Sequence, residues 1–301
     1  MATIVSVGSG KGGVGKSVIA SNLALLFARM GKRVILVDLD ISGANLHVMF
    51  GMHHPPATLT DFITGRVNSL EGVAQEVEWG SGLRLIPGTG ETLATANLLF
   101  AKKKRVVRHL RQMQADLILL DCAPGTSYQA LDFFLVGDIQ LVVATPDPPS
   151  VVELYRFIKL AAIRKVLMIG LARGQKELKA ILMEKEFDSV QEILDTIGRV
   201  DKASQEKAEE VLREFNPLFV LNQTADKTKL SIAYLQQVIY KFIGSELILL
   251  GEIPKDEAVD QSIRIFQPVV DLASKSPAAK ALIQTFHSLQ LRLGDRIPAL
   301  T

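Results

Sequence analysis

Short β-rich runs recur along the chain, and stretches with helical spacing separate most of them. Runs bounded by turn residues are typical of strands buried on both faces of a parallel sheet. The stretch at 18–30 instead places Leu23, Leu26 and Phe27 on one helix face. This alternation predicts a doubly wound, mostly parallel α/β sheet with helices on both faces. The predicted strands lie at residues 4–5, 33–37, 83–86, 117–120, 139–143, 218–221 and 247–250.

One region departs from the regular alternation. From about 155 to 215 the pattern is helical throughout, and its mixed charges predict a solvated outer face. We therefore expect one domain over residues 1–301, with a helical insertion at about 155–215. Ser150 and Ser189 each stand three residues before a glutamate, which is the spacing of a helix-starting capping box. Further helices are predicted at residues 59–63, 70–77, 101–115 and 276–294.

Composition narrows the class of protein. The chain has 301 residues, of which 48% are hydrophobic and 22% charged, as in ordinary globular proteins. Cys122 is the single cysteine, which excludes a disulfide framework or a cysteine-rich metal site within the chain. No secretory signal pattern opens the chain, and no apolar run reaches the roughly 18 residues of a spanning helix. We expect a cytoplasmic protein that could also lie at the inner surface of the membrane.

The glycine-rich stretch after the first strand carries the clearest chemistry. Gly10, Gly15, Lys16 and Ser17 fit the phosphate-loop pattern G-x-x-x-x-G-K-[ST] between a strand and a helix. Glycines let backbone N–H groups turn toward phosphate oxygens, the helix start attracts anions, and the lysine adds a charge. The stretch therefore predicts a nucleotide triphosphate site with Mg²⁺ on the serine hydroxyl. The predicted contacts are Gly10, Lys11, Gly12, Gly13, Val14, Gly15, Lys16, Ser17 and Val18.

Carboxylates end two other predicted strands. Asp38 and Asp40 follow the run at 33–37, and Asp121 follows the run at 117–120. Carboxyl ends of parallel strands present ligand residues at one edge of a sheet. We expect Asp38 and Asp121 to serve the magnesium shell and Asp40 to orient water, with Gly125 offering an N–H to a γ-phosphate. The simpler alternative for Asp38 and Asp40 is capping of the next turn.

A second lysine in the loop points to a family. Lys-Gly-Gly-Val-Gly-Lys-Ser, with Lys11 at its start, resembles the deviant phosphate loop of the MinD/ParA ATPases. The resemblance implies that Lys11 reaches the partner's phosphates in an ATP-bound dimer and that Asp40 positions the attacking water. It also implies a dimer contact for Asn45. The residues Gly43 to Leu46 are most similar to the MinD, FlhG and FleN branch, although His47 replaces a frequent acid there.

The resemblance extends to the nucleotide base. Asn222 resembles the family's adenine-reading asparagine, and Pro254 and Asp256 resemble its base-packing loop. A guanine-reading motif needs lysine and aspartate where Gln223 and Ala225 stand, which favours ATP over GTP. The implied function is a dimerising, Mg²⁺-dependent ATPase switch with a protein effector, controlling the placement or number of a cellular structure.

Two other functions are alternatives to the ATPase switch. A cluster carrier of the same superfamily would need paired cysteines. A DNA-binding partition ATPase would use the basic stretch at 102–111, which has the composition for contact with DNA, a membrane surface or an acidic partner. The net charge of +2 does not by itself indicate nucleic acid, and the stretch could equally be a solvated helix face. Its cations are Lys102, Lys103, Lys104, Arg105, Arg108 and Arg111.

Overall fold

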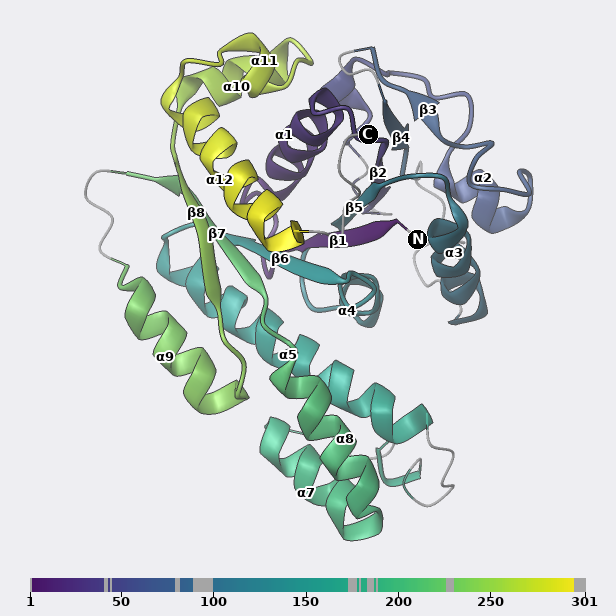
Figure 1. Ribbon diagram of the computed structural model, residues 1–301, viewed down its shortest axis with the longest axis vertical. Coiled ribbons are helices and arrows are strands. Elements are labelled where there is room, and N and C mark those ends of the chain that lie inside the picture. The colour runs from purple at the N-terminus through teal and green to yellow at the C-terminus, as the bar shows by residue number, and fades with distance from the viewer. Residues whose placement is uncertain are drawn as a thin grey trace.

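A computed structural model describes residues 2–40, 43, 45–78, 82–88, 100–172, 178, 180–182, 187, 189–225 and 230–294 (Figure 1). Within these residues eight strands form one sheet in the order β3-β4-β2-β5-β1-β6-β7-β8. Neighbouring strands pair in parallel except β3, which pairs antiparallel with β4. The predicted doubly wound, mostly parallel sheet is therefore confirmed. The strands are β1 (Thr3–Gly8), β2 (Val34–Leu39), β3 (Gln75–Glu76), β4 (Leu83–Ile86), β5 (Leu117–Cys122), β6 (Ile139–Ala144), β7 (Leu218–Thr224) and β8 (Ile248–Pro254).

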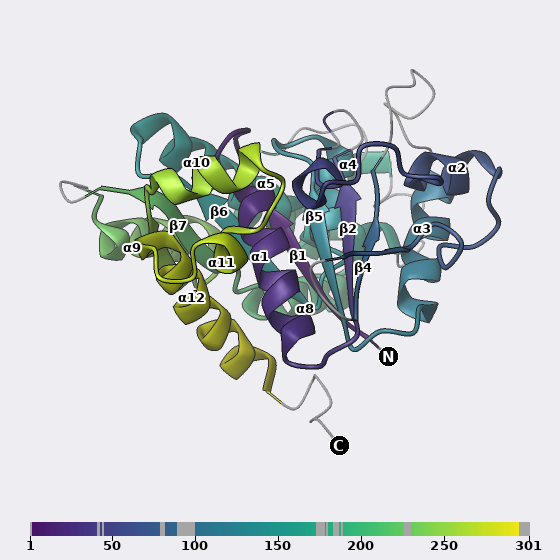
Figure 2. The ribbon, with the colours of Figure 1, turned by 90° about the horizontal axis from the view of Figure 1, so that it is seen from above.

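Helices cover both faces of the sheet, as the two views show (Figures 1 and 2). One face packs against α1, α11 and α12, and the other against α2, α3, α4, α5 and α9. The closing helix α12 buries Leu282, Phe286 and Leu289, so the prediction of a core-facing helix is correct. The helices are α1 (Lys16–Arg29), η1 (Val48–Phe50), α2 (Leu59–Thr64), α3 (Phe100–Gln112), α4 (Tyr128–Phe134), α5 (Pro148–Ala172), α7 (Val190–Val200), α8 (Lys202–Arg213), α9 (Ile232–Ile243), α10 (Glu257–Arg264), α11 (Val269–Leu272) and α12 (Pro277–Leu293).

The register of the central strands brings the predicted site residues to one edge of the sheet. Every residue of β1, β2 and β5 is buried, because helices cover both faces there. Asp38 pairs in register with Asp121, and Val7 of β1 pairs with Asp121 from the other side. The phosphate loop and the strand-end carboxylates therefore meet at one edge of the sheet.

The predicted helical region is built on a long helix. α7 and α8 pack against each other and against α5, and these two helices project beyond the sheet with the C-terminal part of α5 (Figure 1). Ile193 and Ile197 are fully buried in this packing. The Ser189 hydroxyl caps α7 by accepting a hydrogen bond from the N–H of Glu192 at 3.1 Å, as its spacing predicts. Residues 173–177, 179, 183–186 and 188 of the predicted insertion lie outside the described residues.

Two local predictions are wrong. Residues 70–77 do not form a helix, because Val73 and Ala74 close a single turn on Leu70 and the chain then extends into β3. That turn produces the helix-like spacing of apolar residues. Ser150 does not start α5, because the prolines after Asp147 begin the helix earlier, where proline is favoured. The Ser150 hydroxyl accepts a hydrogen bond from the N–H of Thr145 instead.

Candidate nucleotide-binding site

A cavity of about 550 Å³ opens at the carboxyl edge of the sheet. The phosphate loop and the start of α1 form one wall, and the ends of β7 and β8 with α10 form the other. The predicted residues that line it are Lys11, Gly12, Gly13, Val14, Gly15, Lys16, Ser17, Val18, Asp40, Asn222, Pro254 and Asp256. Gly10, Asp38, Asn45, Asp121 and Gly125 do not line it. Sequence reasoning missed Val259 and Ile263 as lining residues, and the signal was their spacing of one helical turn on α10.

The start of α1 is suited to an anion. Gly15 precedes the helix in the left-handed conformation (φ 84°), and no side chain caps the helix. The first turn contains no acid, and Lys16, Ser17 and Val18 of this turn line the cavity. Backbone N–H groups of a first helical turn have no partner within the helix. A phosphate in the cavity would satisfy them and interact favourably with the helix dipole.

Two glycines let the loop pack against its neighbours. A Cβ on Gly10 would stand 2.1 Å from the backbone oxygen of Glu153, and one on Gly15 would stand 2.1 Å from the Asn222 amide nitrogen. That amide donates a hydrogen bond to the carbonyl of Val14 at 2.8 Å. Asn222 therefore tethers the loop in this conformation, and its predicted contact with adenine stays a prediction.

A buried ion pair lies at the base of the cavity, where Lys16 lines the cavity and Asp121 pairs with it from outside the lining. The Lys16 ammonium binds the Asp121 carboxylate, and the two side chains are 7% and 2% exposed. Burial alone lowers the pKa of Lys16, but the charge and hydrogen bond of Asp121 outweigh it and the pKa is raised. The lysine stays charged at the point where the loop meets β5.

Asp38 adds a second buried carboxylate beside this pair. It accepts hydrogen bonds from the N–H groups of Asp40 at 3.0 Å and Leu46 at 3.2 Å. Burial raises the pKa of Asp38 to about 7, and the charge of Asp121 adds to the effect. One ammonium balances only one of the two carboxylates, so the charge at this point favours a further cation. Hard oxygen donors suit Mg²⁺. Asp38, Asp121 and the Ser17 hydroxyl therefore fit a magnesium ion by their chemistry.

The ion pair at the rim of the cavity is exposed, unlike the buried pair at the base. The Lys11 ammonium lies 3.4 Å from the Asp147 carboxylate, and the two side chains are 47% and 43% exposed. A hydrogen bond from the Thr145 hydroxyl lowers the pKa of Asp147, so the carboxylate is charged at neutral pH. Asp40 also lies at the rim, where its carboxylate accepts the N–H of Gly43 at 3.1 Å, and Asn45 is exposed.

Comparison with known proteins assigns the chain to a family. The family model described as "ParA: NUBPL iron-transfer P-loop NTPase" matches residues 1–238. The chain belongs to the ParA family of P-loop NTPases. An uncharacterized ATP-binding protein of Methanocaldococcus jannaschii is 24% identical, over 94% of this chain and 86% of the relative. The flagellum site-determining protein YlxH of Helicobacter pylori is 29% identical, over 74% of this chain and 79% of the relative.

A solved structure shares the fold of this ParA-family chain. The septum site-determining protein MinD from Pyrococcus horikoshii, complexed with Mg-ADP, superimposes with a TM-score of 0.69. The two are 22% identical, and the alignment covers 99% of this chain and 100% of the MinD chain. The resemblance to the MinD/ParA ATPases that the phosphate loop indicates is therefore confirmed.

Two predicted contacts are occupied within this ParA-family chain. The N–H of Gly125 donates to the carbonyl of Ser9 at 2.9 Å, so sensing a γ-phosphate would require that bond to break. The Asp256 carboxylate accepts the N–H groups of Ala258 at 3.0 Å and Ala278 at 2.9 Å. It thereby holds the starts of α10 and α12 at the rim of the cavity.

The iron transfer in the family model's description meets an obstacle in this chain. Cys122 is its single cysteine and is fully buried at the end of β5. Burial raises the pKa of its thiol far above the ordinary value, which disfavours the thiolate that binds metals. Among the described residues there is also no group of three or more histidine, cysteine or acidic side chains arranged for a metal ion.

No helix in the described part of the chain combines the length and the apolar character needed to cross a membrane.

Proposed function

We propose that this ParA-family protein is a switch that dimerises on Mg²⁺-ATP and separates after hydrolysis. The observation that carries the proposal is the contrast between the two lysines of one loop. Lys16 is buried against Asp121, whereas Lys11 makes a half-exposed contact with Asp147. Exposed pairs of that kind contribute at most about 1 kcal/mol, so Lys11 is free to exchange Asp147 for a phosphate of a second chain.

Each residue at the cavity has a role in hydrolysis under this proposal. Lys16 and the first turn of α1 hold the phosphates. Ser17, Asp38 and Asp121 would hold Mg²⁺, which would supply positive charge at the phosphates. Asp40 orients a water whose oxygen bonds to the γ-phosphorus while the bond to the ADP oxygen breaks, releasing phosphate.

The residues at the end of the cavity where the nucleobase would lie support ATP as the nucleotide. Asn222 and Gln223 lie near the end of β7, and Gln223 adopts a positive φ of 56°. Neither offers the carboxylate that pairs with the guanine N–H groups. Pro254 with Ile253 and Val259 supplies an apolar surface on which a purine ring can stack.

The names of two relatives support a proposal for the cellular role. YlxH is named for determining the site of a flagellum, and MinD for determining the site of a septum. We infer that this chain likewise controls the placement or number of a cellular structure through a protein effector. A DNA partition role is the second candidate, and its support is the cluster of cations on α3.

Light scattering beside a phosphate-release assay tests the proposal. The protein is measured without nucleotide and with Mg²⁺ plus ADP, ATP or a non-hydrolysable ATP analogue. We expect twice the monomer mass with ATP and the analogue only, steady phosphate release with ATP, and weaker competition by GTP. A monomer in all four conditions would contradict the proposed dimer. Competition by GTP as strong as that by ATP would contradict the proposed preference for adenine. Binding to a DNA duplex that falls steeply with salt would favour the partition role.

A further inference from the structure

A second cavity, of about 540 Å³, lies between α3, α4 and α5. We call it the α3–α5 groove. It shares no lining residue with the nucleotide cavity. Its apolar part consists of Ala101 and Val107 from α3, Val136 after α4, and Met168 from α5. The floor is therefore apolar and is contributed by three separate segments.

The rim of the groove is strongly basic. Lys103, Lys104, Arg105 and Arg108 of α3 line it, and Asp132 is the one acid among its described lining residues. Asp132 is shared by two cations, since it binds the Lys103 ammonium and also accepts the Arg164 Nε–H at 2.7 Å. One carboxylate between two cations leaves a surplus of positive charge around an apolar floor.

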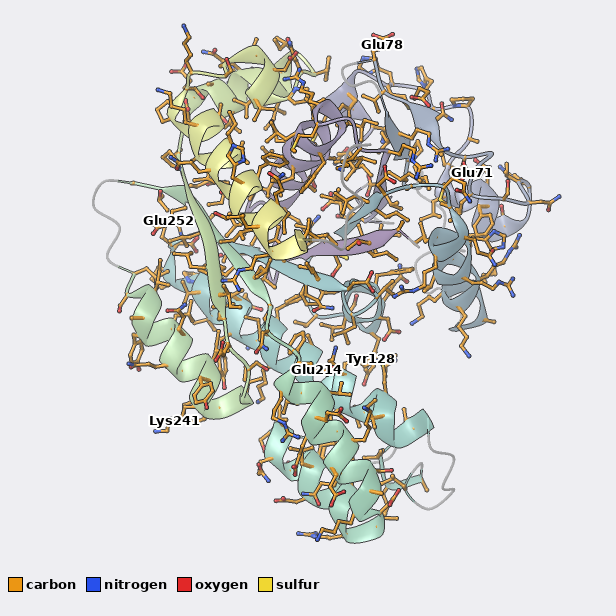
Figure 3. The ribbon with its side chains drawn as sticks, viewed as in Figure 1. Glu71, Glu78, Tyr128, Glu214, Lys241 and Glu252 are labelled. Atoms are coloured by element: carbon orange, nitrogen blue, oxygen red, sulfur yellow. The ribbon has the colours of Figure 1, made fainter. Side chains whose placement is uncertain are left out.

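Large side chains of the kind that anchor protein interfaces are exposed here. Met168 is 44% exposed, and Tyr128 at the start of α4 is 71% exposed. Figure 3 labels Tyr128, which lies beside α5. The Arg164 guanidinium lies over the Tyr128 ring at 5.0 Å from its centre and bonds Asp132 as well. Tyrosine, methionine and arginine are enriched at protein–protein interfaces. These contacts hold the tyrosine and the arginine in place beside the groove without covering it.

The same geometry favours a protein segment over a lipid surface or DNA as the occupant of the α3–α5 groove. The apolar face of α3 is not free to enter a bilayer, because Val106 and Leu110 are fully buried in the protein core. Several of the helix's cations are engaged within the protein: Lys103 pairs with Asp132, Arg111 pairs with Asp138, and the Arg105 guanidinium lies over the Phe62 ring at 4.4 Å from its centre. What remains is a concave apolar floor with cations at its edge, and DNA offers no apolar ridge to fill such a floor.

We propose that the α3–α5 groove docks an acidic amphipathic helix from a partner protein. Such a helix presents apolar side chains at positions i, i+4 and i+7, which fit the floor formed by Val107, Val136 and Met168. Acidic residues flanking that stripe meet Arg108 and the other cations of the rim. The proposal concerns a site apart from the nucleotide cavity and does not depend on ATP turnover.

A peptide display library of randomised 16-residue helices, selected on the full chain, tests this directly. Counter-selection on a Met168→Glu variant removes peptides that bind elsewhere. We expect the surviving peptides to carry net negative charge and an i, i+4, i+7 apolar stripe. Survivors without acidic residues, or no survivors, would overturn the proposal.

Anisotropy titrations with a synthesised survivor then measure the site. We expect Met168→Glu and Arg108→Glu each to raise Kd at least tenfold. The matched controls Leu291→Glu and Arg292→Glu change an exposed apolar residue and an exposed cation on α12, and should stay within twofold. Thermal melting and ADP binding confirm that each variant is folded. Equal loss in the controls would overturn the proposal, as would Arg108-dependent binding of phosphatidylserine vesicles or a DNA duplex in place of any peptide.

Discussion

The base and the rim of the nucleotide cavity each pair a lysine with an aspartate, yet the two pairs differ in almost every physical respect. At the base, Lys16 and Asp121 are buried, and a second carboxylate, Asp38, lies beside them. At the rim, Lys11 and Asp147 are nearly half exposed and 3.4 Å apart. Breaking a buried pair strands a charge away from water, whereas breaking an exposed pair costs little.

This contrast explains how two lysines five residues apart can have different tasks. Lys16 is fixed, because moving it would leave the buried Asp121 carboxylate without its counter-charge, beside a second buried acidic group, Asp38. Lys11 can change partners at small cost. Under the proposed function, Lys16 at the base of the cavity binds phosphate within the chain, and Lys11 at the rim recognises a second chain.

The largest effect on nucleotide binding and stability is expected from a substitution at the base of the nucleotide cavity. Lys16→Ala should abolish ATP binding, with Kd raised at least 10³-fold, and lower the free energy of unfolding by roughly 3–5 kcal/mol, because Asp121 loses its partner. Calorimetry and urea unfolding measure the two effects. A Lys16→Ala/Asp121→Asn double variant should regain stability without regaining binding. Full stability in the single variant would show that the pair does not hold the base together.

Asp40→Ala should separate chemistry from binding at the rim. If Asp40 orients the attacking water, removing its carboxylate should lower turnover roughly 10²-fold or more while leaving ATP affinity nearly unchanged. The ATP-bound dimer should therefore accumulate. Phosphate release and light scattering in Mg²⁺-ATP measure this. Parent-rate hydrolysis, or a monomer, would mean that Asp40 has another role.

The buried carboxylates should make stability depend on pH. The pKa of Asp38 is about 7 in the folded chain against an ordinary 3.8, so between these values the folded protein keeps a proton that the unfolded chain releases. The free energy of unfolding should thus fall, by roughly 2–4 kcal/mol, as pH rises from about 4 to 7, and Asp38 should contribute no further change above that. Urea unfolding in EDTA, without nucleotide, should show a shallower slope for Asp38→Asn. Parallel slopes would contradict the shift.

The smallest effect on the isolated chain is expected for Lys11→Ala. Loss of an exposed pair should change the free energy of unfolding by less than about 1 kcal/mol and nucleotide affinity only slightly. Dimer formation and turnover, in contrast, should fail. Unchanged ATP-dependent dimerisation in this variant would remove the role of Lys11 toward a second chain.

The sequence predicts well what is local and less well what depends on distant partners. The loop from Gly10 to Ser17 and the strand-end Asp38 and Asp121 can be read directly, because spacing and parallel topology place them. The contact of Asn222 with Val14 spans 208 residues, and that of Lys11 with Asp147 spans 136. Such pairings depend on how the loops pack after the sheet forms, and no periodicity encodes them.

The α3–α5 groove illustrates the same limit. The cations of α3 are evident from the sequence, and so is the apolar face that includes Val106 and Leu110. The sharing of Asp132 by Lys103 and Arg164 is not, since it joins three helices. Likewise, an early turn on Leu70 gives the spacing of a helix, and only the pairing of β3 with β4 shows the extended strand.

Mixing two inactive variants tests the central claim most directly. In a mixed dimer of Lys11→Ala and Asp40→Ala chains, the first chain keeps its own Asp40 and receives Lys11 from its partner. If Lys11 acts across the dimer, one complete site forms, and phosphate release should rise well above the sum of the two variants measured alone. If Lys11 acts within its own chain, neither site is complete. Phosphate release in the mixture no greater than that sum would contradict the account.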